Sequence, residues 1–177
     1  MIGYVCKYTP VEVFEAMGVE IGRIQPEVTN FNQADTLMHP NICSFTKSVL
    51  EDVLAGDYEG VVLTTCCDSI RRLYDVLKQQ CPDKFLYLLD VPRKVNDFST
   101  EMYRKNILDM VHAYEAFSGK SFDETVLKQL LERREAGQNL RTAPKNKASV
   151  HIGLMGARCS KGIIDLLENR GVDILFD

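Results

Sequence analysis

The chain has 177 residues, of which 45% are hydrophobic and 26% charged, so it can form one globular domain with a full core, or one domain and the start of a second. A net charge of −4 and an isoelectric point near 5.4 exclude a globally basic protein of the kind that binds nucleic acid or anionic membranes. No apolar run is long enough to cross a bilayer and the N-terminus has no signal-peptide pattern, so we expect a cytoplasmic location.

Short apolar runs alternate with amphipathic patterns along residues 1–95. The apolar runs are bounded by turn residues and predict strands at 2–8, 19–25, 60–65 and 84–92. Hydrophobic residues at helical spacing predict helices at 9–18, 43–56 and 67–80, with an Asn-rich loop before the second helix. This alternation is typical of right-handed βαβ units. The predicted fold is therefore α/β, a doubly wound, Rossmann-like parallel sheet.

The pattern changes after residue 95. Two helices and no strand are predicted between Asp97 and Ala136, and a linker containing Gly, Pro, Asn and Lys follows. We predict a first α/β domain at 1–95, a helical segment and linker at 96–147, and the opening βαβ unit of a second α/β domain at 148–177. A single βαβ unit leaves the second sheet short of partner strands. We therefore expect the chain to be a fragment, or to pair with a partner chain.

The cysteines concentrate where a parallel sheet binds its ligands, at the carboxyl ends of the strands. Cys66 and Cys67 follow the third predicted strand, and Asp68 or Ser69 after them can cap the next helix. Cys43 lies directly before another predicted helix. Helix N-termini favour anions and lower the pKa of thiols, so these three cysteines are placed to be thiolates.

Two further cysteines fall at corresponding turns, Cys6 after the first predicted strand and Cys159 in the second α/β segment, whereas Cys81 lies at a helix end. A cysteine at a strand end is often a buried apolar residue, so packing remains an alternative for each of them. Zinc-ribbon and redox CxxC spacings are absent, and no histidine is predicted beside the thiols for Cys–His catalysis. The remaining hypothesis is ligation of a soft cluster by cysteines that are distant in sequence.

Three stretches resemble the 2-hydroxyacyl-CoA dehydratase family, of the (R)-2-hydroxyglutaryl-CoA dehydratase type. They are GYVCKYTPVEVFEAMG at 3–18, HPNICSFTKSVLEDVLAGDYEGVVLTTCCDSIRRLYDVLK at 39–78, and LLDVPRK at 88–94. In the second stretch Cys-Ser opens a helix, an apolar strand follows, and Cys-Asp-Ser precedes an Arg-Arg-Leu-Tyr helix. In this order and spacing the stretches resemble the N-terminal half of a dehydratase subunit.

The resemblance implies a [4Fe–4S] cluster that is bound by three cysteines and has one open iron. By motif match, Cys43 corresponds to the first ligand and Cys67, in Cys-Asp-Ser, to the second. The third ligand is expected from a C-terminal α/β domain beyond residue 177. The resemblance assigns no ligand role to Cys66, Cys6 or Cys159.

The activity implied by the resemblance is that of a lyase of anaerobic metabolism, which removes water from a 2-hydroxyacyl-CoA. A separate ATP-dependent iron–sulfur activator protein injects one electron, and a ketyl radical forms at the thioester carbonyl. The open iron would hold a substrate oxygen as a Lewis acid. The expected partner is a second dehydratase subunit or a second copy of the chain. Two alternatives stay open: a truncated, non-catalytic paralogue that pairs with a partner subunit, and a component of a double-cubane-type iron–sulfur reductase.

Four basic residues near the predicted turns are candidates for the phosphates of CoA: Arg71, Arg72, Arg93 and Lys94. For Arg71 and Arg72 a solvated helix face is the simpler interpretation. The apolar stripe of Tyr103–Phe117 is interpreted as core packing.

Overall fold

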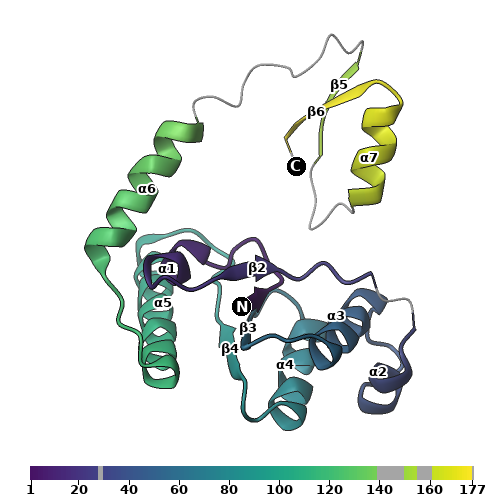
Figure 1. The fold of residues 1–177 in the computed structure, drawn as a ribbon, viewed down its shortest axis with the longest axis horizontal. Coiled ribbons are helices and arrows are strands. Elements are labelled where there is room, and N and C mark those ends of the chain that lie inside the picture. The colour runs from purple at the N-terminus through teal and green to yellow at the C-terminus, as the bar shows by residue number, and fades with distance from the viewer. Residues whose placement is uncertain (28–29, 139–149, 155–160, 177) are drawn as a thin grey trace. The chain divides into compact units, whose positions relative to one another are not determined.

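The computed structural model describes residues 1–27, 30–138, 150–154 and 161–176, and the chain divides into two compact units, Met1–Leu130 and Leu131–Asp177. In the first unit, helices cover both faces of a parallel sheet (Figure 1). Its elements are, in chain order, β1 (Ile2–Tyr4), α1 (Val11–Ala16), β2 (Ile21–Arg23), α2 (Asn32–Leu37), α3 (Ser44–Ala55), β3 (Gly60–Thr64), α4 (Asp68–Gln80), β4 (Phe85–Leu89) and α5 (Asp97–Ser118).

The four strands of the first unit are all parallel and lie in the order β2–β1–β3–β4. β1 is central, with Tyr4 level with Arg23 of β2 on one side and with Val62 of β3 on the other. The chain first adds β2 on one side of β1 and then β3 and β4 on the other side, so the strand order reverses between β1 and β3. The carboxyl ends of such a strand pair are the usual ligand site of a doubly wound sheet. The predicted doubly wound, Rossmann-like parallel sheet is confirmed.

β3 is buried along its whole length because helices cover both of its faces. Val61 and Leu63 belong to a core with residues of α3 and α4, whereas Val62 belongs to the opposite core, with residues of α1 and α5. Accordingly, α1 and α5 lie on one side of the strands in Figure 1, and α3 and α4 on the other. β3 begins at Gly60, where a Cβ would clash with the carbonyl oxygen of Phe85 on β4. The absence of a side chain lets the two strands pair closely.

α5 packs against the sheet beside β4 and buries Met110, Val111 and Tyr114. The ring of Tyr114 meets those of Phe14 and Phe85 edge-on, with centroids 5.2 and 4.9 Å apart. Edge-to-face pairs of this kind add to the stabilisation that burial provides. The interpretation of this stripe as core packing is confirmed for the buried residues.

The prediction of a loop before α3 was wrong for residues 32–37, which form the short helix α2. The buried carboxylate of Glu51, on α3, accepts hydrogen bonds from the backbone N–H groups of Gln33 (2.7 Å) and Ala34 (2.8 Å). These N–H groups lie in the first turn of α2, where a helix has no internal partners for them. Because a residue on another helix supplies the cap, the local sequence carries no capping signal.

In the second unit, β5 (Val150–Gly153) and β6 (Val172–Phe176) form a parallel pair, with α7 (Lys161–Asn169) between them in sequence. α6 (Glu124–Gln138) crosses the division between the two units. That these elements open a second α/β domain stays a prediction. Most of the predicted linker and Cys159 lie outside the described residues.

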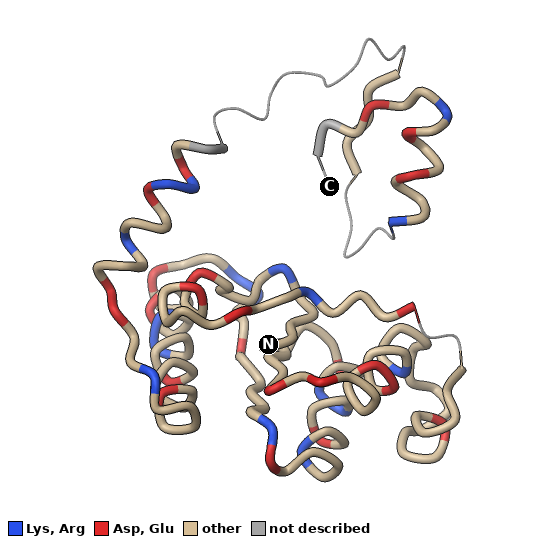
Figure 2. Tube along the Cα trace, in the orientation of Figure 1, with Lys and Arg blue, Asp and Glu red and all other residues tan. Residues whose placement is uncertain are grey.

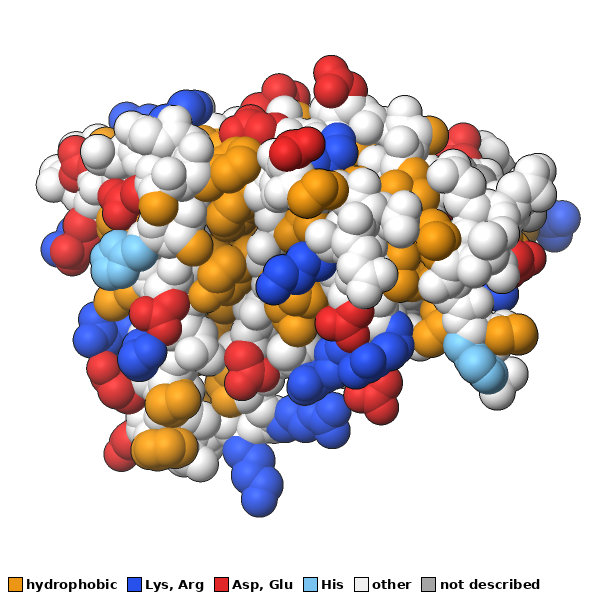
Figure 3. Space-filling view, turned by 90° about the horizontal axis from the view of Figure 1, so that it is seen from below, with side chains coloured by type: hydrophobic (Ala, Val, Ile, Leu, Met, Phe, Trp, Pro, Cys, Tyr) orange, Lys and Arg blue, Asp and Glu red, His pale blue; other side chains and the backbone are white. Residues whose placement is uncertain are grey.

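Charged residues of both signs are spread along the described chain (Figure 2). On the face drawn in Figure 3, Lys and Arg side chains lie close to Asp and Glu, with hydrophobic side chains showing between them. The exposed ion pair of Lys105 with Asp109 on α5 (2.7 Å) is one example of this mixing. Within the part of the chain that the structure describes, no helix is long and apolar enough to span a membrane.

Candidate functional site

The carboxyl ends of β1 and β3 bring cysteines together where the strand order reverses. Cys6 follows β1, and Cys66 and Cys67 follow β3. After burial, the nearby Cys6 thiol is one of the groups that raise the pKa of the Cys66 thiol. All three, like Cys43, are free thiols. Loops from two neighbouring strands therefore form the thiol-bearing edge that the sequence predicted.

Cys43 is the N-cap residue of α3, with extended backbone (φ −62°, ψ 146°) and an exposed side chain. Its Sγ lies 3.1 Å from the hydroxyl oxygen of Thr46. Partial burial acts to raise the pKa of the Cys43 thiol, but hydrogen bonds, led by those of Thr46 and joined by one from Ser69, outweigh it and leave the pKa below its usual value. These donors stabilise the thiolate, which is the form that binds metals.

Cys67 holds the same position on the next helix, as the N-cap residue of α4 (φ −153°, ψ 164°). Ser69, in the first turn of α4, is the residue that hydrogen-bonds to the Cys43 thiol. Two exposed cysteines therefore mark the N-termini of two helices that pack together. The prediction that Asp68 or Ser69 caps this helix was wrong, because α4 already includes Asp68 and its N-cap is Cys67 itself.

Cys66 and Cys67 are adjacent in sequence but have different surroundings. Burial raises the pKa of the Cys66 thiol most, the nearby hydroxyl of Thr64 lowers it, and Cys6 and Cys67 raise it further. Thr64 is fully buried, and within the described chain its Oγ1 makes no hydrogen bond of ordinary geometry. A buried hydroxyl normally has a partner, so Thr64 is available to donate to a sulfur ligand at this edge.

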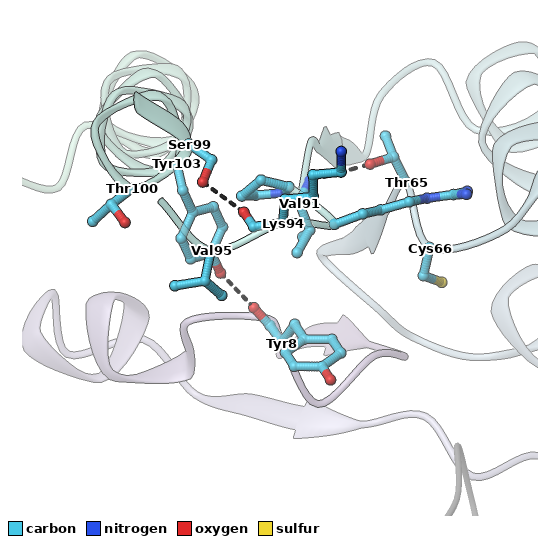
Figure 4. Close-up of a pocket in the computed structure, with 11 residues that line it drawn as sticks. Tyr8, Thr65, Cys66, Val91, Lys94, Val95, Ser99, Thr100 and Tyr103 are labelled. Atoms are coloured by element: carbon cyan, nitrogen blue, oxygen red, sulfur yellow. Dashed lines mark hydrogen bonds between the residues drawn. The ribbon is translucent and has the colours of Figure 1, made fainter. Parts of the chain in front are cut away.

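A cavity of about 530 Å³ opens beside Cys66, at the carboxyl ends of β3 and β4 (Figure 4). Its wall is mostly apolar with a few polar groups, as is typical of ligand pockets of this size. In Figure 4, Thr65 and Cys66 lie on one side of the cavity and Tyr103 on the other. The lining residues are Tyr8 after β1, Thr65 and Cys66 after β3, Val91–Val95 after β4, and Ser99, Thr100 and Tyr103 on α5.

Hydrogen bonds fix both sides of this cavity. The hydroxyl of Tyr103, on α5, donates to the backbone oxygen of Tyr8 at 2.7 Å and ties the loop after β1 to α5. Opposite, Thr65 Oγ1 donates to Asp90 Oδ1 at 2.5 Å and accepts from the N–H of Val91 at 3.1 Å. The Tyr103–Tyr8 and Thr65–Val91 bonds are drawn in Figure 4. The cavity wall is therefore preorganised in the absence of a ligand.

Of the four basic candidates for phosphate binding, Arg93 and Lys94 line the cavity. Arg72 instead forms an exposed ion pair with Asp75 on α4 (Nη1–Oδ2 2.9 Å), which agrees with the interpretation as a solvated helix face. Sequence reasoning missed Tyr103 as a cavity residue, because its helical spacing indicated only packing. The signal that distinguishes it, the bond to the Tyr8 loop, exists only in three dimensions.

The donor set fits one side of an iron–sulfur cluster. Such clusters are held by thiolates, and Cys43 and Cys67 are exposed free thiols at the N-termini of packed helices. The buried hydroxyl of Thr64, which lowers the pKa of the Cys66 thiol, lies at the same edge. Among the residues that the structure describes, no three side chains of His, Cys, Asp or Glu converge to hold a metal ion. Cys81 is buried at the other end of α4.

The fold and the thiol-bearing edge define a doubly wound α/β protein with a ligand site at the reversal of strand order. Comparison with known families makes this class specific: the family model described as 2-hydroxyglutaryl-CoA dehydratase, D-component, matches residues 6–152. The chain therefore belongs to this dehydratase family, as the resemblance implied.

The chain is also similar to the (R)-phenyllactyl-CoA dehydratase beta subunit of Clostridium sporogenes. The two sequences are 27% identical over 139 residues. The alignment covers 74% of this chain and 36% of that subunit, so the chain matches about a third of the length of its relative.

Proposed function

We propose that this chain is the part of a 2-hydroxyacyl-CoA dehydratase subunit that holds a [4Fe–4S] cluster, with Cys43 and Cys67 as ligands. In this proposal the whole enzyme eliminates water from a 2-hydroxyacyl-CoA by a ketyl-radical route. The observation that supports the ligand pair best is the position of both cysteines as N-cap residues of two helices that pack together, α3 and α4. Membership of the dehydratase family supplies the chemical context.

The helix termini suit this role because their first backbone N–H groups have no partner within the helix. These groups favour anionic ligands, and thiolates on a cluster carry such charge. Thr46 Oγ1 lies 3.1 Å from Cys43 Sγ, and the hydroxyl of Thr64 lowers the pKa of the Cys66 thiol at the same edge. Hydrogen bonds to ligand sulfur tune the potential of such a site. When bound, the cluster supplies a Lewis-acidic iron and a one-electron carrier.

The cavity beside Cys66 is proposed to receive the acyl part of the thioester. Its apolar wall excludes water from the reacting carbon atoms. Arg93 and Lys94, which line it, are proposed to bind the phosphates of CoA. The bond between Tyr103 and Tyr8 keeps the far wall in place while the acyl group binds.

Two partners belong to this proposal. An ATP-dependent iron–sulfur activator protein delivers the electron, and a second dehydratase subunit or a second copy of the chain completes the enzyme. The third cluster ligand is proposed to come from a C-terminal α/β domain of the whole subunit, as the resemblance to the dehydratase family implies.

Anaerobic reconstitution of the full chain with iron and sulfide tests the ligand assignment. We expect the wild-type chain to bind both and to show thiolate-to-iron charge-transfer absorption in the visible range. Cys43→Ala and Cys67→Ala should each lose most of the iron and of this absorption, because each removes one thiolate. Cys81→Ala is the matched control: it removes a buried thiol from the other end of α4 and should keep both signals.

An unchanged spectrum in both ligand variants, with circular dichroism showing folded chains, would contradict the assignment. A folded wild-type chain that binds neither iron nor a CoA ester would favour the alternative, a non-catalytic paralogue. Either result would reject the proposed chemistry but would not change the fold.

A further inference from the structure

One face of α5 carries a groove that shares no lining residue with the cavity beside Cys66. The groove has a volume of about 300 Å³. We call the residues that line it the α5 strip, and all of them lie on α5: Phe98, Glu101, Met102, Arg104, Lys105 and Leu108. Because one helix supplies this lining, the groove has no opposite wall within the part of the chain that the structure describes.

The α5 strip exposes large apolar side chains to solvent. Phe98 is 76% exposed, and Met102, one turn further along the helix, is 42% exposed. Single exposed apolar side chains are common, but residues four positions apart on a helix are neighbours and form a continuous apolar surface. A continuous apolar surface with charged residues around it is typical of an interaction site.

The helix cannot turn the strip inward, because its other face is already buried. Met110, Val111 and Tyr114 are the buried residues of α5, and the helix packs beside β4. The ring of Tyr114 meets those of Phe14 and Phe85 edge-on. The core therefore fixes the orientation of α5, and only another molecule can cover the strip.

The order of residues along the strip makes its apolar ends complementary to a second copy of the chain. In an antiparallel pair of identical helices related by a twofold axis, a residue before the midpoint lies beside the residue that is equally far after it. The midpoint between Phe98 and Leu108 is position 103. Phe98 of each copy therefore meets Leu108 of the other, and Met102 meets the aliphatic stem of Arg104.

The same symmetry places opposite charges together. Glu101 precedes position 103 by as much as Lys105 follows it, so Glu101 of each copy meets Lys105 of the other. Within one copy, Glu101 pairs with Arg104 (Oε1–Nη2 3.0 Å) and Lys105 pairs with Asp109 (Nζ–Oδ2 2.7 Å). Both pairs are exposed and contribute little to stability, so their groups can also pair across an interface.

We propose that the α5 strip is the interface at which two copies of this chain form an antiparallel, twofold-symmetric dimer. Burial of Phe98 and Met102 drives the association, and the contacts between Glu101 and Lys105 set the antiparallel direction. Six side chains per copy bury a small area by the standard of permanent dimers, so the dimer is weak and depends on concentration. The inference does not depend on the proposed cluster, because neither candidate ligand lies on α5.

Sedimentation equilibrium of the full chain across the micromolar range tests the proposal. We expect a reversible monomer–dimer equilibrium. Phe98→Glu should raise the dissociation constant at least about tenfold, because it replaces the aromatic anchor with a charge. Leu166→Glu is the matched control: it changes an apolar side chain of α7 that is 55% exposed and should leave the constant unchanged.

Exchange of charges tests the antiparallel pairing. Glu101→Lys puts lysine opposite lysine, and Lys105→Glu puts glutamate opposite glutamate. Each variant alone should raise the dissociation constant about tenfold, because two symmetric attractive contacts become repulsive. An equimolar mixture of the two variants should regain the affinity of the wild type, since every lysine then meets a glutamate on the other copy. Circular dichroism confirms that each variant is folded.

A wild-type chain that stays monomeric across this range overturns the proposal and leaves the strip to a partner of different sequence. The proposal is also overturned by a dimer that survives Phe98→Glu, or by one that Leu166→Glu dissociates. A mixture of the charge variants that associates no better than either variant alone rules out the antiparallel pairing and with it the proposed interface.

Discussion

Cys66 and Cys67 show how neighbouring atoms give two adjacent thiols different chemistry. Burial raises the pKa of the Cys66 thiol most, and the Cys6 thiol raises it further. Cys67 stands at the positive end of a helix, where anions are favoured. Cys43 has donors that lower its pKa. Three thiols near one sheet edge therefore differ in their roles because their hydrogen-bond partners differ.

At the same scale, Tyr114 should make the stability of the first unit sensitive to alkaline pH. Its buried hydroxyl donates to Glu59 Oε1 at 3.0 Å, and burial together with this carboxylate raises the pKa of Tyr114 to about 12. Because the folded state holds the neutral phenol, its contribution is full below pH 10 and is lost as the pH rises through about 12. We expect the unfolding free energy to fall by roughly 2 kcal/mol over this range.

Denaturant titrations of the wild type and of Tyr114→Phe at several alkaline pH values measure this effect. The variant should be less stable at neutral pH by about 1 kcal/mol, because it loses one hydrogen bond. It should also lose part of the alkaline decline. The part that remains is expected from Tyr58, whose pKa is likewise raised to about 12 by burial and by Asp52. An identical alkaline decline in both proteins would contradict the assignment to Tyr114.

At the scale of elements, contacts between α2 and α3 hold the segment that ends at Cys43. α3 caps the first turn of α2 through Glu51, and Lys47 of α3 pairs with Asp35 of α2 at 2.6 Å. The segment between these helices ends at Cys43, the N-cap of α3. The position of the candidate ligand therefore depends on contacts between helices as well as on its own backbone.

Glu51→Ala should loosen α2 without unfolding the sheet. The substitution leaves two N–H groups of α2 without their carboxylate acceptor and is expected to reduce the stability of α2 by about 2 kcal/mol. Hydrogen exchange of the Gln33 and Ala34 amides should rise by at least tenfold, while exchange in β3 stays unchanged. Glu101→Ala, which removes an exposed carboxylate paired with Arg104 one turn along α5, is the control and should change neither. Unchanged exchange at Gln33 and Ala34 would show that α2 is held by other contacts.

At the scale of the molecule, both hydrophobic cores lie within the first compact unit. One core unites α2, α3, β3 and α4, and the other unites β1, α1, β3, β4 and α5. The partly buried residues that pack against these cores extend no further along the chain than Phe122. The candidate thiols and the cavity all belong to the same unit, Met1–Leu130.

A fragment of residues 1–130 should therefore fold without the rest of the chain. It contains every residue of both cores, so its urea unfolding is expected to be cooperative, with a midpoint close to that of the first transition of the full chain. Circular dichroism and urea titration of the two proteins make the comparison. A fragment that unfolds without cooperativity would show that the second unit stabilises the first.

The order of strands and helices in the first unit was predictable because their hydrophobic periods are local properties. GVVLT is buried on both faces and carries its apolar run without interruption, and α4 shows a clear helical stripe. α2 was not predictable, because its cap comes from Glu51, on another helix. Local sequence patterns do not predict a helix whose first backbone N–H groups are hydrogen-bonded by a residue distant in sequence.

By itself, the sequence determined the alternation that produces a parallel sheet, the placement of thiols at strand ends, and the motifs that the dehydratase family shares. Only the tertiary structure decided which thiols are neighbours. The strand order places β1 beside β3, so Cys6 and Cys66, sixty positions apart, follow neighbouring strands, while Cys67, adjacent to Cys66, lies at a helix terminus. The cavity likewise exists only once α5 packs beside β4 and Tyr103 bonds to Tyr8. Pairing across a sheet and packing between helices join residues far apart in the chain, and no local period records such contacts.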